Sequence, residues 1–271
     1  MINSEIVIDK VFTYNFIENK KYSSEILNLC RKNNIIIKTL KSTDLAKLRK
    51  SLFIGNSFFI GWQFKTPIYK NFYVFHDSLL PKFSGFSPTV SALIKGEKKI
   101  GISLFEPKGD LDKGKIIYQK KLTIKYPIKI SEAYDLITTN ISKIIFSYYK
   151  DNKFLIKKNI KFQKRTFSIW RDDKDYFINW HQSALKIVNF INATGYPYDN
   201  AKTIYNGKII KIIDCEIGNK LNFEEIHPGK IFQIIKKQPH VTTLTNLIII
   251  KSAKYLNNKL VVFNKIRKRL G

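Results

Sequence analysis

Residues 73–124 read YVFHDSLLPKFSGFSPTVSALIKGEKKIGISLFEPKGDLDKGKIIYQKKLTI, and this stretch decides the fold. β-branched and aromatic residues just before His76 are typical of a strand that runs into a polar loop. Pro88 suits the first turn of a helix, and Gly96 suits the residue after its end. The stretch therefore predicts a strand entering a loop at 73–83, a helix at 87–96, and strands at 99–106 and 115–124 around the loop 107–114.

The sequence on either side extends this pattern into two domains. Upstream, strands at 5–14, 34–40 and 57–62 alternate with helices that begin at Ser23 or Ser24 and at Thr43 or Asp44, which indicates a doubly wound, mostly parallel α/β sheet. A helix with one apolar stripe follows at 131–149. A second helix at 182–193 and short strands with turn signals predict a small, OB-like β-barrel. We expect a catalytic domain at 1–150, a linker at 151–175 and the barrel at 176–271.

The composition excludes several classes of protein and leaves one open question. With 48 Lys+Arg against 21 Asp+Glu the formal charge is +27, which favours an anionic partner, although a Lys-rich chain is also typical of an AT-rich genome. Two isolated cysteines and four histidines without ligand spacing predict neither a disulfide framework nor a metal site. The longest apolar run is far below the about 20 residues that span a bilayer, so we expect a cytoplasmic protein that does not enter the membrane.

His76 is the first candidate for chemistry, because it ends a predicted strand, and open α/β sheets place ligands beyond the carboxyl ends of their strands. A histidine there suits a general base or an oxyanion donor, and it also suits a side chain that only caps a turn. A second polar loop, Gly109–Gly114, lies between two other strands. A carboxylate from this loop would orient the imidazole, as the acid does in hydrolytic triads.

The stretch from His76 to Gln119 resembles a family signature, HxSLLPxYRGxxPxxWAxxxGxxxTGVTxxxxxxxLDxGxI, which belongs to the folate-dependent formyltransferases. The match runs without a gap and keeps the interval from the signature His to the signature Asp, here Asp112. Residues 179–212 are similar to the segment that opens the C-terminal barrel of methionyl-tRNA formyltransferase and of some sugar relatives.

The resemblance implies a reaction and a set of site residues. An amine attacks the formyl carbon of the co-substrate 10-formyltetrahydrofolate, and tetrahydrofolate leaves. His76 is then expected to stabilise the oxyanion or relay the amine proton, with Asp112 orienting it and holding the released proton. The implied folate-binding residues are Trp62, Phe64, Gly109, Asp110 and Leu111.

Two departures from the family pattern bear on activity. Relatives carry Asn two residues before the signature His, where it binds the formyl oxygen, but this chain has Val74. Losing one such donor costs about 100- to 1000-fold in rate, so another group, Gln63 or Asn71, is expected to replace it. The chain also starts at the family's second strand, which we interpret as an N-terminal truncation.

Three alternatives remain for the function: transfer to an amino sugar, transfer to initiator methionyl-tRNA, or binding without catalysis. The segment 13–22 lacks the basic, Gly-containing loop of the tRNA enzymes, and Ser84-Gly85 replaces the signature's Arg-Gly. These features favour a nucleotide-linked amino-deoxy sugar, with Ser78 and Lys82 binding its phosphates or hydroxyls. The net charge of +27 favours the tRNA alternative. Val74, where relatives carry Asn, favours the third alternative, a catalytically impaired binding protein. A homodimer is compatible with each of them.

Overall fold

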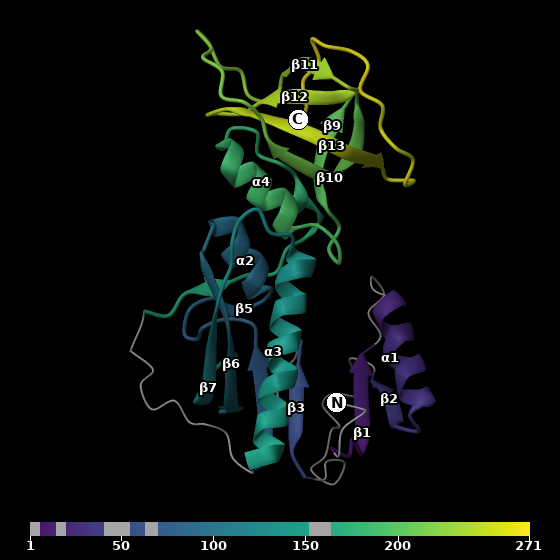
Figure 1. The fold of residues 1–271 in the computed structure, drawn as a ribbon, viewed down its shortest axis with the longest axis vertical. Helices are drawn as coiled ribbons and strands as arrows, with labels where there is room; N and C mark the ends of the chain where they lie inside the picture. The colour runs from purple at the N-terminus through teal and green to yellow at the C-terminus, as the bar shows by residue number, and fades with distance from the viewer. Residues whose placement is uncertain (1–5, 15–19, 41–54, 63–69, 152–163) are drawn as a thin grey trace. The chain divides into compact units, whose positions relative to one another are not determined.

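The N-terminal part forms a strand–helix–strand unit (Figure 1). The computed structural model describes residues 6–14, 20–40, 55–62, 70–151 and 164–271. Strand β1 (Lys10–Tyr14) pairs in parallel with β2 (Ile36–Leu40), and helix α1 (Lys20–Lys32) connects them. The predicted strands and first helix are confirmed here. The second helix predicted at Thr43 or Asp44 lies outside the described residues.

The central sheet has four strands in the order β3-β4-β6-β7, namely β3 (Ser57–Ile60), β4 (Phe72–His76), β6 (Lys99–Pro107) and β7 (Gly114–Thr123). β4 is parallel to β3 but antiparallel to β6. The sheet is therefore mixed, which corrects the expectation of a mostly parallel sheet. A run of apolar residues indicates that a strand is buried on both faces, which is typical of parallel sheets. Here the antiparallel neighbours β4 and β6 are buried in the same way, so the run does not reveal strand direction.

Two helices accompany this sheet in the sequence. α2 (Pro88–Lys95) begins with proline and ends at Gly96, whose φ of 78° is left-handed, as predicted. α3 (Ile130–Asp151) buries Ala133, Ile137, Ile141, Ile144 and Ile145 of its predicted apolar stripe, and Leu136 is half-buried. The short strands β5 (Ser84–Gly85) and β8 (Phe167–Ser168) form a two-stranded ladder, and a 3-10 helix, η3 (Asp173–Tyr176), follows.

The C-terminal region packs α4 (Ala184–Ala193) against an antiparallel sheet (Figure 1). The strand order is β11-β12-β13-β10-β9, with bounds β9 (Ala201–Tyr205), β10 (Lys208–Ile217), β11 (Ile231–Ile235), β12 (Gln238–Thr242) and β13 (Leu247–Tyr255). Within residues 167–271, all of which are described, no pairing joins β9 to β11, so the predicted closed barrel is absent. Turn residues predict hairpins, but closure also depends on the tilt and stagger of the strands.

The chain divides into two compact units, and each unit combines several stretches. Unit 1 comprises Met1–Ser84, Gly101–Lys121 and Ile137–Thr166, and unit 2 comprises Gly85–Ile100, Leu122–Leu136 and Phe167–Gly271. The domain boundaries expected near residues 150 and 176 stay predictions. In the described part of the chain, no helix combines the length and apolar character needed to cross a membrane.

Candidate active site

His76 is the last residue of β4, and its side chain is only 8% exposed. The strand is buried along its whole length, between β3 on one side and β6 on the other, where Ser103 is the partner of His76. Because the flanking strands fix the backbone of β4, the position of the imidazole at the end of this strand is fixed as well. This is the strand end at which the sequence predicted the site.

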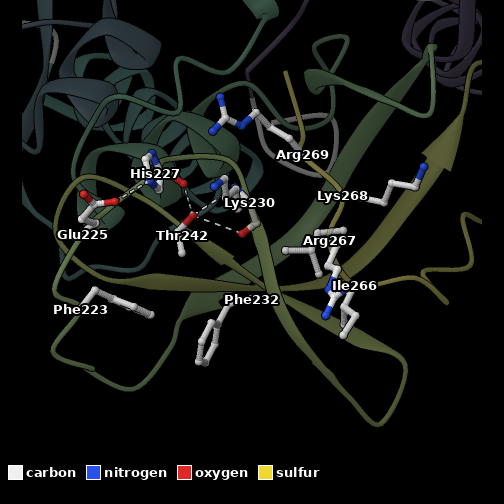
Figure 2. A pocket seen from close by; sticks show the side chains of 11 residues that line it. Phe223, Glu225, His227, Lys230, Phe232, Thr242, Ile266, Arg267, Lys268 and Arg269 are labelled. Carbon is white, nitrogen blue, oxygen red and sulfur yellow. Dashed lines mark hydrogen bonds and ion pairs between the residues drawn. The ribbon is translucent and has the colours of Figure 1, made fainter.

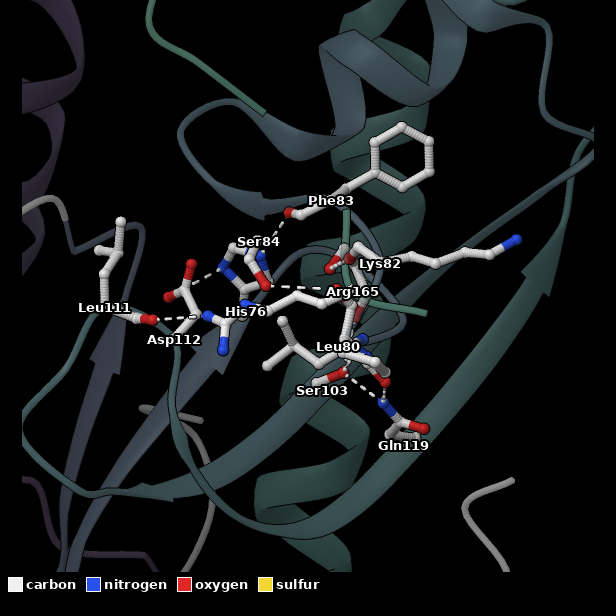
Figure 3. A network of polar contacts seen from close by, with 12 residues as sticks. His76, Leu80, Lys82, Phe83, Ser84, Ser103, Leu111, Asp112, Gln119 and Arg165 are labelled. Atoms are coloured by element: carbon white, nitrogen blue, oxygen red, sulfur yellow. Dashed lines mark hydrogen bonds and ion pairs between the residues drawn. The ribbon is translucent and has the colours of Figure 1, made fainter. Parts of the chain in front are cut away.

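The two ring nitrogens of His76 face different partners (Figure 3). Nε2 lies 3.0 Å from the carbonyl oxygen of Phe83, and Nδ1 lies 3.6 Å from Oδ1 of Asp112. A carbonyl oxygen only accepts hydrogen bonds, so Nε2 donates in this contact. Nδ1 and the carboxylate attract each other when the imidazole holds a second proton or a donor lies between them. The pair is thus arranged to receive a proton.

Asp112 reaches His76 from a tight loop between β6 and β7. The amide of Lys108 donates to the carbonyl oxygen of Lys113 at 2.9 Å, which closes the loop. Asp112 itself has a left-handed φ of 49°, which Asp tolerates better than most residues. A Cβ on Gly114 would lie 1.9 Å from the backbone oxygen of Glu106, so the loop requires glycine there. The backbone therefore sets where the Asp112 carboxylate lies, and the side chain is 10% exposed.

The loop 77–84 after His76 is held by a buried polar network. Oγ of Ser103 donates to the carbonyl oxygen of Ser78 at 2.7 Å and accepts from the amide of Leu80 at 2.9 Å. Nε2 of Gln119 donates to the carbonyl oxygen of Leu80 at 2.7 Å and to Oγ of Ser103 at 2.8 Å. Three of these four contacts anchor the loop backbone to the sheet, and the fourth holds Gln119 against Ser103. The position of the Phe83 carbonyl that faces His76 follows from this anchoring.

Residues Arg165 and Thr166, which we call the 165–166 clasp, contact both loops. Figure 3 shows Arg165 beside Leu111. Nη2 of Arg165 donates to the carbonyl oxygen of Leu111 at 2.7 Å. Oγ1 of Thr166 accepts from the amide of Phe83 at 2.9 Å, and the Thr166 carbonyl oxygen accepts from the amide of Ser84, also at 2.9 Å. The clasp thus holds the loop that carries Asp112 and the loop that faces Nε2 of His76.

Val74, where relatives carry a hydrogen-bonding Asn, lies in an apolar cluster. It is 7% exposed and packs with Phe59, Leu80 and the ring of Trp62. Of the expected replacements, Asn71 precedes β4, about 16 Å along the strand from His76 at roughly 3.3 Å per residue, so it does not replace the missing amide. Gln63 and Phe64 lie outside the described residues.

The remaining predicted site residues lie on the two loops. Gly109, Asp110 and Leu111 belong to the Asp112 loop, where the Leu111 side chain is 50% exposed. Ser78 is buried, and its hydroxyl donates to the carbonyl oxygen of Lys82 at 2.7 Å. The exposed Lys82 side chain extends away from His76 (Figure 3). Their roles toward folate or acceptor stay predictions.

Sequence reasoning missed Ser103, Gln119 and the 165–166 clasp. Ser103 gives a signal, because it is the one hydroxyl in the apolar run 100–105. Arg165 is one of only six arginines, but it lies in a basic stretch that we interpreted as a linker. Its partner is a backbone carbonyl 54 residues away, which no local pattern reveals.

A cavity of about 500 Å³ lies in unit 2 beside β11 and β12 (Figure 2). Four cationic side chains line it, those of Lys230, Arg267, Lys268 and Arg269. Glu225 is the acidic residue of its lining, and it lies 3.2 Å from Nε2 of His227. The cavity is therefore suited to an anionic group. Among the described residues, no group of three or more His, Cys, Asp or Glu is arranged to hold a metal ion.

Comparisons with known proteins place the chain in a family. Residues 59–146 match the model of the formyl transferase family, and residues 171–267 match the model of the formyl transferase C-terminal domain. A methionyl-tRNA formyltransferase from Prochlorococcus marinus is 30% identical over 227 residues, which cover 76% of this chain and 67% of that protein.

Solved structures share the fold at lower identity. The sugar 3N-formyl transferase WlaRD, solved with dTDP and 5-N-formyl-THF, is 21% identical with a TM-score of 0.55, over 86% of this chain and 82% of that one. HypX from Aquifex aeolicus, in complex with tetrahydrofolic acid, is 13% identical with a TM-score of 0.61. The match covers 94% of this chain, which spans 45% of HypX. By its two family models and its curated relative, the chain belongs to the folate-dependent formyltransferase family.

Proposed function

We propose that this protein transfers the formyl group of 10-formyltetrahydrofolate to the amine of a nucleotide-linked amino-deoxy sugar. The observation that carries the proposal is the buried His76–Asp112 pair, with 3.6 Å between Nδ1 and Oδ1, at a strand end of a formyltransferase fold. Tetrahydrofolate in the HypX complex and 5-N-formyl-THF in the WlaRD structure support a folate co-substrate.

The reaction balances without a metal or a redox partner. The amine nitrogen forms a bond to the formyl carbon, and the resulting oxyanion collapses as the bond from that carbon to N10 of the folate breaks. One proton leaves the amine and one arrives at N10, so none is gained or lost overall. His76 takes the amine proton, and Asp112 stabilises the imidazolium that forms.

A substrate must displace one contact of His76 before this can happen, because Nε2 is bonded to the Phe83 carbonyl. We infer that the substrate takes the place of this carbonyl and leaves the Asp112 contact intact. Such an exchange places the amine beside Nε2, and the neutral imidazole then carries its proton on Nδ1, toward Asp112, so that Nε2 accepts the amine proton. Gln63 is kept as the proposed substitute for the amide missing at Val74, and Trp62, Phe64 and the Asp112 loop as the folate contacts.

A nucleotide-linked sugar is supported by the sequence departures and by one structural neighbour. The predicted position of the tRNA-binding loop carries neither Arg nor Gly at 13–22, and WlaRD is a sugar 3N-formyl transferase solved with dTDP. Lys82 is exposed on the loop that follows His76 and would contact the anionic nucleotide.

One observation favours initiator tRNA as the second candidate acceptor. The cavity of Figure 2 combines Lys230 with the run Arg267–Arg269, and a cationic surface of this kind suits a phosphate backbone. A tRNA acceptor would make binding fall steeply with salt, because each phosphate contact releases a counterion.

The test offers the purified full chain 10-formyltetrahydrofolate with three acceptors in parallel. These are a dTDP-3-amino-6-deoxy sugar, a dTDP-4-amino-6-deoxy sugar and initiator methionyl-tRNA, and the readout is the mass of the N-formyl product. We expect transfer to one of the sugars. Transfer to tRNA alone would overturn the sugar proposal, and no transfer to any acceptor would overturn the enzyme proposal and favour a binding protein.

The matched control is His76→Ala, assayed with whichever acceptor is active. We expect turnover to fall by about 100- to 10,000-fold, because the imidazole supplies the acid–base step. The far-ultraviolet circular dichroism of the variant should match that of the wild type. Retained turnover would exclude His76 as a catalytic residue.

A further inference from the structure

A cavity of about 470 Å³ lies between α2, the segment 171–179 and α4, all of them in unit 2. Its polar lining comes from Ser91, Lys95, Arg171, Asn179, Gln182 and Lys186. None of the residues that line it is acidic. It shares no residue with the His76 site or with the cavity of Figure 2.

Arg171 is the residue that distinguishes this cavity. Its Nη2 donates to Oγ of Ser91 at 3.2 Å, while Nη1 is buried and has no hydrogen-bond partner. The neighbouring acid, Asp172, bonds to the backbone instead, because its Oδ1 accepts from the amide of Lys174 at 2.8 Å. A guanidinium has five N–H donors, and burying its charge without an anion is costly. Among the residues that the structure describes, the guanidinium of Arg171 therefore lacks an anionic partner, and an oxyanion would supply one.

In the described part of the chain, a buried cation in the same unit, Lys202, is paired with carboxylates, unlike Arg171. The side chain of Lys202 is 5% exposed and forms ion pairs with both Asp173 and Asp199. Burial alone would raise the pKa of Asp199, but its hydrogen bonds with Lys202 and Lys211 outweigh burial and lower the pKa. Within the described residues Arg171 has no such carboxylate, although the fold supplies two to Lys202.

Ser91 explains why there is space beside Arg171. In the family signature quoted above, the position of Ser91 is a tryptophan, so here a hydroxyl replaces an indole ring. The small side chain leaves the cavity open on the α2 side, and its oxygen holds one arm of the guanidinium. The apolar part of the lining comes from Ile94, Phe177, Ile178, Ile187 and Phe190.

We propose that this cavity binds a small organic oxyanion, a carboxylate or a phosphate ester, whose flat apolar body packs on Phe177 and Phe190. Arg171 contacts the oxyanion with its planar fork, which matches both groups in a bidentate geometry. Lys186 adds positive charge and is exposed, whereas the exposed Lys95 already pairs with Glu97 at 3.5 Å. Carboxylate and phosphate share this recognition chemistry, so the experiment has one arm for each.

The test titrates the full-length protein with benzoate, phenyl phosphate and the uncharged isostere benzamide, using calorimetry and amide chemical shifts. We expect benzoate or phenyl phosphate to bind at least tenfold more tightly than benzamide. Binding should shift the amide signals of Ser91 and Ile187 in the wild type. The stronger of the two anions identifies the group that the cavity prefers.

Variants locate the binding within the unit. We expect Arg171→Gln, which removes the charge, and Ser91→Leu, which fills the space, each to weaken binding at least tenfold. Arg31→Gln is the matched control, because it removes the same charge from the exposed surface of α1, and its affinity should equal that of the wild type. Equal binding of benzamide, shifts confined to other residues, or full affinity in Arg171→Gln would each overturn the proposal.

Discussion

The loop after His76 and the loop that carries Asp112 hold the two partners of one pair, but they are held in different ways. The first is anchored by buried side chains, Ser103 and Gln119, that bond to its backbone. The second is shaped by its own backbone, and Nη2 of Arg165 donates to its Leu111 carbonyl oxygen from outside the loop. We infer that the position of His76 is set by the core, whereas the position of Asp112 is set by the backbone of its loop together with Arg165 of the clasp.

The largest expected effect comes from removing the charge of Asp112 without changing its loop. Asp112→Asn keeps the shape of the side chain, and Asn tolerates the left-handed φ of 49°. We expect kcat to fall by about 100- to 10,000-fold, because the imidazolium loses its anionic partner. The midpoint of urea unfolding should stay at the wild-type value. A kcat within threefold of the wild type would show that the pair is not catalytic.

The clasp is tested next, by Arg165→Gln. Without the bond to the Leu111 carbonyl, Asp112 is less well positioned, and misplacement of about 1 Å costs up to about 100-fold in rate. We expect kcat to fall by about tenfold to 100-fold and KM for the acceptor to change little.

A second variant distinguishes a positioning role of Arg165 from a purely structural one. Arg165→Lys keeps a cationic donor and is expected to recover part of kcat. If Arg165→Gln raised KM and left kcat unchanged, Arg165 would bind substrate instead of positioning the loop.

The anchoring of the first loop predicts a loss of stability. Ser103→Ala leaves the buried amide of Leu80 without its acceptor, at a cost of about 1–3 kcal/mol in the free energy of unfolding. Ser142→Ala is the matched control, because its hydroxyl bonds to the Thr138 carbonyl within α3 and is exposed. Urea unfolding compares the two variants. Equal small losses would mean that the first loop does not depend on the buried network.

The smallest effect is expected from the surface of the second loop. Nζ of Lys113 lies 2.8 Å from Oδ2 of Asp110, but both side chains are more than half exposed. Exposed ion pairs contribute little, so Lys113→Gln should change the free energy of unfolding by less than about 1 kcal/mol. A loss as large as that of Ser103→Ala would contradict the difference between the two loops.

The sequence predicted the order of helices and strands well, because that order depends on local patterns. The helix at 131–149 was recognised from one apolar stripe, and α3 is observed as Ile130–Asp151. His76 and Asp112 were found by a motif with a fixed spacing, and the structure brings them together.

Strand direction and barrel closure were not predictable, since they depend on pairing between distant segments. β4 and β6 both appear as apolar runs, whichever way they pair. The clasp was missed for a related reason, because Arg165 acts on a backbone carbonyl and leaves no residue pair to recognise.

The clasp also constrains when the site can form during synthesis. Thr166 is 83 residues beyond Phe83, to which it bonds, so the ribosome delivers the clasp after both loops of the site. A nascent chain that has already emerged through Asp112 holds both members of the pair but not the segment that joins their loops. Contacts between such distant residues close late and slow folding. The His76–Asp112 pair is therefore expected to mature after translation of the N-terminal half, as one late event.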